Sequence, residues 1–122
     1  MKFLIAVYDT RSVSASVEEM AAITALNDEL RTNNQLVMAV GLAHPSSGIV
    51  IDGRVGLAHA RPSRNSDGVG VGGVPDNSGG EAEEFMSGFW ILEVSSPHEG
   101  RELARRAATA CSRRVELREI FD

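Results

Sequence analysis

Two histidines are the side chains of this chain best suited to proton-transfer chemistry. His44 and His59 each follow a segment with strand character, so both are expected in loops at an end of a sheet, where a pocket could form. Imidazole exchanges a proton near neutral pH, which suits it to general acid–base catalysis. The alternative for each is a surface imidazole without a chemical role. His98 lies in the first turn of an expected helix and is expected to face solvent.

Carboxylates follow in one stretch and could orient such an imidazole. Asp76, Glu81 and Glu84 are the candidates, because a carboxylate beside a histidine fixes its tautomer. The same carboxylates, Glu81 and Glu84 in particular, could instead bind a polar substrate. The alternative is that Glu81 and Glu84 only favour a helix N-terminus. Arg61 or Arg64 could hold an anionic group of a substrate.

Tyr8 and Glu93 are further candidates for substrate binding. Strand side chains alternate between two faces, and the apolar residues beside these two are expected to point toward the helices. Tyr8 and Glu93 would then share the opposite face. A glutamate among apolar strand residues is costly unless it has a partner. The alternative for Glu93 is a carboxylate in water at the edge of an interface.

Several other patterns carry no chemistry. The glycines of residues 68–73 match the alternating pattern of dinucleotide-binding loops, but no helix follows to receive a pyrophosphate, so a flexible loop is expected. Cys111 is the single cysteine, which excludes an internal disulfide. No spacing of His and Cys suggests a zinc site. The sequence therefore predicts neither a metal nor a cofactor.

Composition limits the partners. A length of 122 residues favours a single domain that spans residues 1–122. The net charge of −5 argues against a nucleic-acid or anionic-membrane partner. The arginines of the last 22 residues alternate with glutamates, which is typical of a solvated face of paired charges. No run approaches ~18 apolar residues, and the opening apolar run is too short for a signal peptide, so a cytoplasmic location is expected.

The periodicity predicts two helices and several strands. The strongest strand is the aromatic run 85–94, which is apolar enough to be covered on both faces. Capping signals start helices at Ser16, with Glu19 reaching back, and at Ser96. The expected elements are strand 3–8, helix 16–33, strand 36–43, a hairpin over 48–58 with its turn at Asp52-Gly53, a long Gly-rich loop over 61–80, a helical turn at 81–84, strand 85–94, helix 96–112 and strand 115–121.

This order predicts an α+β fold. Without the hairpin and the loop it is βαβ-βαβ, the ferredoxin-like arrangement of an antiparallel sheet with both helices on one face. The first helix would turn Met20, Ile23, Leu26 and Leu30 toward that sheet. The other face of the sheet would be bare unless a second copy of the chain covers it.

A family pattern is found in five segments of the chain: the opening residues 1–8, residues 26–31, Gly41-Leu42, residues 52–54 and the run 81–90. Together these segments resemble the YCII-related proteins, specifically their DGPF subgroup. The subgroup signature, Asp-Gly-Pro-Phe-x-Glu-x-Lys-Glu followed by Gly-Gly-Phe, meets residues 76–84 and 87–89. It matches at Asp76, Glu81, Glu84, Gly88 and Phe89 and departs at positions 77, 78, 79 and 83. Residues 62–75 look like an insertion relative to the family.

The resemblance implies a dimeric α/β barrel, in which two ferredoxin-like sheets face one another. Some relatives are proposed to use a His-Asp pair for acid–base chemistry. It therefore implies a homodimer. The first hypothesis for its function is a cofactor-independent enzyme of proton transfer, elimination or isomerisation, with a small molecule bound in a cleft at the dimer. His44 or His59 would be the catalytic acid–base group, Asp76 or Glu81 its orienting carboxylate, and the loop 61–80 a lid.

The alternative is a non-catalytic ligand-binding or accessory dimer. The departures from the signature favour it, because a Gly-rich replacement could not hold catalytic groups rigidly. Converging ionisable groups in a pocket would favour the enzyme, and an apolar surface patch without them would favour the alternative.

Overall fold

The computed structural model describes residues 1–10, 15–54, 59–62 and 84–122. Its elements, in chain order, are β1 (Lys2–Asp9), α1 (Val17–Thr32), β2 (Leu36–Gly41), the 3₁₀ helix η1 (Pro45–Ser47), β3 (Ile49–Asp52), β4 (His59–Pro62), β5 (Phe85–Glu93), α2 (Pro97–Cys111) and β6 (Arg114–Glu119). Among the described residues, no helix is long and apolar enough to cross a membrane.

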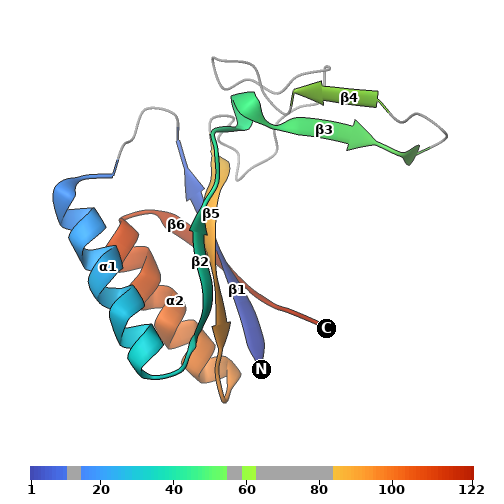
Figure 1. Ribbon diagram of the computed structural model, residues 1–122. Coiled ribbons are helices and arrows are strands. Elements are labelled where there is room, and N and C mark those ends of the chain that lie inside the picture. The colour runs from blue at the N-terminus through green and yellow to red at the C-terminus, as the bar shows by residue number, and fades with distance from the viewer. Residues whose placement is uncertain (11–14, 55–58, 63–83) are drawn as a thin grey trace.

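Four strands form one antiparallel sheet in the order β2-β5-β1-β6. Both helices pack on the same face of this sheet, and no helix of the described residues covers the other face (Figure 1). β5 is an internal strand and β6 is an edge strand, as predicted. This mixed α+β architecture is compatible with the ferredoxin-like prediction.

The helix boundaries follow the predicted caps. The hydroxyl of Ser16 accepts the backbone N–H of Glu19 at 3.1 Å, and Ser96 does the same for Glu99 at 3.1 Å. Asn34, just past α1, takes the left-handed conformation with φ of 58°. The predicted return of the Glu19 carboxylate to Ser16 is wrong, because that carboxylate accepts from the guanidinium of Arg113 at 3.0 Å.

The core lies between the sheet and the two helices. β1 and β5 turn alternate apolar side chains toward the helices, and the small-residue face of α2 approaches the sheet closely. The buried residues of this core cluster are Phe3, Ile5, Val7, Leu26, Leu30, Trp90, Leu92, Val94, Leu103, Ala104, Ala107 and Cys111. Met20 was predicted to face inward and is instead 56% exposed, since the first turn of α1 leaves it at the rim of a cavity.

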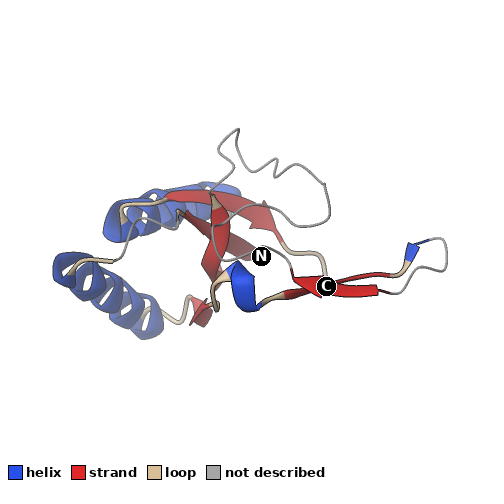
Figure 2. Cartoon of the chain, turned by 90° about the horizontal axis from the view of Figure 1, so that it is seen from above, coloured by secondary structure: helices blue, strands red, loops and turns tan. Residues whose placement is uncertain are grey.

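β3 and β4 form a separate two-stranded antiparallel ladder, with Asp52 opposite His59. The predicted two-residue turn at Asp52-Gly53 is therefore wrong, and Arg61, predicted in a loop, lies in β4. The cause is local: the Asp52 carboxylate accepts the backbone N–H of Arg54 at 2.9 Å and pairs with its guanidinium at 2.7 Å, which takes the chain out of the ladder. This β3–β4 arm projects from the sheet on the side opposite the helices (Figure 2).

Candidate functional site

Ionisable side chains gather at one end of the helix-free face. The strand register places Tyr8 of β1 between Met86 of β5 and Arg114 of β6. Glu116 is two residues along β6 on the same face, and Glu84 immediately precedes β5. We call Tyr8, Glu84, Arg114 and Glu116 the sheet-end cluster.

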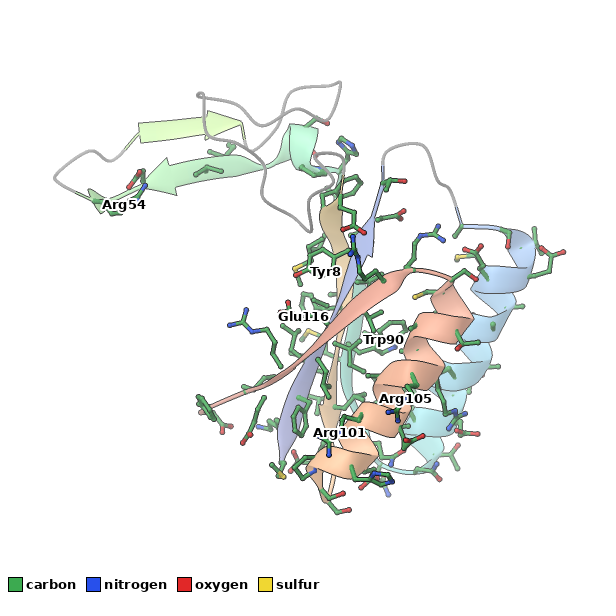
Figure 3. All side chains as sticks on the ribbon, turned by 180° about the vertical axis from the view of Figure 1, so that it is seen from behind. Tyr8, Arg54, Trp90, Arg101, Arg105 and Glu116 are labelled. Carbon is green, nitrogen blue, oxygen red and sulfur yellow. The ribbon has the colours of Figure 1, made fainter. Side chains whose placement is uncertain are left out.

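One contact of this cluster joins the two strands β1 and β6. The Tyr8 hydroxyl donates a 2.9 Å hydrogen bond to a carboxylate oxygen of Glu116 (Figure 3). This bond raises the pKa of Tyr8 above its ordinary value, because the ionised phenol could no longer donate it; partial burial adds to the effect. The charge of Glu84 acts in the same direction and that of Arg118 opposes it.

A second contact fixes a buried carboxylate. Glu84 is only 8% exposed, and the Nε of Arg114 donates to one of its oxygens at 3.0 Å, while a terminal nitrogen of the same guanidinium donates to the other. A two-point contact of this kind is the strong form of an arginine–carboxylate pair. It compensates the cost of burying the charge of Glu84.

His44 lies at the same end of the sheet. Its ring packs edge-on against Phe85, with 4.9 Å between the ring centroids, and Phe85 pairs with Asp9 beside Tyr8. The backbone N–H of Ser46 donates to Nδ1 of His44 at 3.1 Å. Nδ1 is therefore an acceptor, so the neutral ring carries its proton on Nε2 and can donate it to a ligand.

The other predicted site residues lie elsewhere. His59 and Arg61 belong to β4, in the arm. Glu93 pairs with Lys2 at the far end of β5, where its carboxylate lies 3.8 Å from the ammonium group of Met1. Asp76 and Glu81, like the Gly-rich stretch 63–80, lie outside the described residues.

The charge pattern of the sequence does not single out two members of the cluster. Arg114 and Glu116 belong to the alternating charges that are typical of a solvated face. Their signal was the alternation with Val115 and Leu117, which turns the two charged residues to one face of β6 and the apolar ones to the core. In the described part of the chain, no group of three or more His, Cys, Asp or Glu could hold a metal ion.

The family model of the YCII-related domain matches the chain over residues 1–122. The chain belongs to the YCII-related family. A comparison of this YCII-related chain with curated proteins gives no significant match. The narrower resemblance to the DGPF subgroup stays a prediction, because within the signature stretch 76–84 the structure describes Glu84 alone.

Proposed function

We propose that this YCII-related chain is a homodimer that binds a small molecule at the sheet-end cluster and acts on it by acid–base chemistry. The observation that carries the proposal is the convergence of the Tyr8–Glu116 and Glu84–Arg114 pairs at one end of the helix-free face. A buried carboxylate held by an arginine, next to a tyrosine of raised pKa, is typical of a functional site.

The rest of that face supports the dimer. Met38 and Val40 of β2, which pair with Ile91 and Phe89 of β5, are 46% and 38% exposed. Apolar side chains gathered on one face mark an interaction site. A second copy related by a two-fold axis would bury the same surface on both subunits.

The β3–β4 arm supports the same arrangement. Ile49 and Ile51 of β3 are each 68% exposed, and the arm extends on the helix-free side, where the second copy would lie. In the proposed dimer the arm packs against the partner. The strand β4, which carries His59 and Arg61, then lies beside the partner rather than in the cluster of its own subunit.

The proposed reaction is the movement of a proton next to a carbonyl group. The Glu116 carboxylate takes a proton from the α-carbon of the substrate, and His44 donates its Nε2 proton to the carbonyl oxygen. The product is an enol, with the proton now on Glu116 and the imidazole deprotonated at Nε2. Reversal returns a proton to the same or another carbon, which gives exchange or isomerisation without a cofactor.

The test is hydrogen exchange at the α-carbon in D₂O, followed by proton NMR over a panel of small ketones and 2-oxo acids. The wild type should accelerate exchange for at least one compound, and His44→Ala and Glu116→Gln should each slow it by about a hundredfold or more. His98→Ala, in the exposed first turn of α2, is the matched control and should leave the rate unchanged. Undiminished exchange by His44→Ala would refute this mechanism.

The second candidate is a non-catalytic ligand-binding or accessory dimer. The observation that favours it is that Tyr8, Glu84 and His44 already have partners within the chain. In that case members of the same panel would shift the NMR signals of the cluster saturably, while no compound would exchange its α-protons faster than in buffer.

A further inference from the structure

A cavity of about 290 Å³ lies on the other side of the sheet, between α1 and the strands β2 and β5. α1 contributes Met20, Ile23 and Asn27, which lie on one side of the helix. Ala39 of β2, Trp90 of β5 and Cys111 at the end of α2 also line it. Its described lining contains no aspartate, glutamate, lysine, arginine or histidine.

The backbone leaves this space open. Gly88 of β5 lines the cavity, and a Cβ atom built on it would lie 2.6 Å from the carbonyl oxygen of Val40. The close approach of β2 to β5 therefore requires glycine at position 88, and no side chain can project from there into the cavity. Gly41 and Ala39 add further positions with little or no side chain on the opposite strand.

One hydrogen-bond donor at the wall has no partner among the residues that the structure describes. The indole N–H of Trp90 donates to Oδ1 of Asn27 at 2.6 Å. Because an indole nitrogen can only donate, this bond fixes the orientation of the amide and turns its NH₂ group away from Trp90. Among the described residues, no group accepts from that NH₂. It is a polar anchor in a cavity whose described lining is mostly apolar and includes one further hydroxyl, that of Ser87.

The thiol of Cys111 adds no charge to this lining. Burial raises the pKa of Cys111, so that the group stays a neutral thiol near neutral pH. A charged ligand would therefore find no opposite charge here, and its desolvation would be unfavourable. An uncharged ligand fits the lining best.

We propose that this cavity is a second binding site, which takes a small uncharged aromatic molecule with one hydrogen-bond acceptor. The ring of the ligand packs against Ile23 and Trp90, and its acceptor oxygen accepts a hydrogen bond from the NH₂ group of Asn27. An apolar cavity of about 150 Å³ holds benzene. The volume here accommodates one ring with a short substituent. The site is independent of the proposed function, which concerns the opposite face of the sheet.

The chain carries its own reporters for the test, since it has one tryptophan and one cysteine and both line the cavity. The probes are acetophenone and cumene, which have nearly the same shape but differ in the acceptor oxygen. Acetophenone should shift the single indole N–H signal of a ¹⁵N-labelled sample saturably and bind roughly fivefold tighter than cumene. At saturation it should also slow the reaction of Cys111 with a thiol reagent.

Substitutions distinguish binding in the cavity from binding at the protein surface. Ala39→Leu should fill the space and abolish the shift, whereas Ala21→Leu, which makes the same change on the exposed side of α1, should leave binding unchanged. Asn27→Leu should remove the preference for acetophenone over cumene. His44→Ala, which tests the sheet-end cluster, should have no effect here.

The decisive comparison uses the wild type alone, so it holds even where a variant does not fold. Absence of a saturable shift with acetophenone would overturn the binding site. Equal affinities for acetophenone and cumene would overturn the role of Asn27, and unchanged binding in a folded Ala39→Leu protein would place the ligand elsewhere.

Discussion

The hydroxyl of Tyr8 donates a hydrogen bond of 2.9 Å to Glu116 and so links β1 to the edge strand β6 on the helix-free face. This contact is open to a direct test, because Tyr8 is the only tyrosine of the chain. Ultraviolet absorbance therefore reports the ionisation of this one phenol without interference from others.

We predict that Tyr8 titrates above the ordinary tyrosine pKa of about 10 and that Glu116→Ala lowers its pKa toward that value. Because the folded-state pKa is raised, the stabilisation is complete below the unfolded pKa and is lost as the pH rises through the folded pKa. Glu119→Ala, which removes a carboxylate from the same strand, should change the titration little. A tyrosine pKa equal in the wild type and in Glu116→Ala would contradict the contact.

Loss of the cation beside Glu84 should destabilise the fold. Arg114→Met leaves a carboxylate that is 8% exposed without this donor, and we expect a loss of roughly 1–2 kcal/mol in urea unfolding, moderated because Arg114 itself is half exposed. Arg118→Met, which removes an exposed cation from the same strand, should cost less than about 0.5 kcal/mol. The double variant Arg114→Met with Glu84→Gln should recover part of the loss, and additive losses would argue against the pair.

The close approach of β2 and β5 predicts a contrast between two glycines. Gly88→Ala would place a methyl group 2.6 Å from the Val40 carbonyl oxygen and should destabilise the protein by about 1–3 kcal/mol. Gly41→Ala, on the facing strand, meets only a carbonyl oxygen at 4.0 Å and should be nearly neutral. Thermal unfolding of the two variants measures the difference. Equal melting temperatures would be incompatible with this packing.

The contacts of Glu99 predict that the free energy of unfolding depends on pH in the acid range. Its pKa is lowered first by the hydroxyl and backbone N–H of Ser95, which donate to its carboxylate, and then by Gln35. The resulting stabilisation is present above the unfolded pKa and is lost as the pH falls through the folded pKa. Urea midpoints should therefore differ between wild type and Glu99→Gln near pH 6 and converge as the solution becomes more acidic. A difference that persists unchanged in acid would have another origin.

The sheet and its helices could be predicted because their signals are local. Ser16 and Ser96 form the predicted caps, and the inward alternation of Phe3, Ile5 and Val7 is confirmed. The hairpin turn could not be predicted, because turn propensities do not include the side-chain pairing of Asp52 with Arg54, which competes with the strand ladder. As a result, β3 pairs with residues 59–62 instead of with the residues directly after the expected turn.

The cluster could be predicted only in part, because its members are far apart in the sequence. Tyr8 and Glu84 were candidates by residue type and resemblance, but their partners on β6 depend on the sheet register. The charge alternation near the C-terminus was also misleading. Arg113, expected on a solvated face, has a side chain that is 8% exposed and pairs with Asp9 at 2.9 Å.

The most direct test of the central proposal is analytical ultracentrifugation at a few micromolar protein. The proposed closure of the helix-free face predicts a species of twice the chain's mass. Val40→Lys, which puts a charge on that face, should shift it toward the single chain, while Ala21→Lys on the exposed side of α1 should not. A wild-type protein that sediments as a stable, folded single chain would contradict the account.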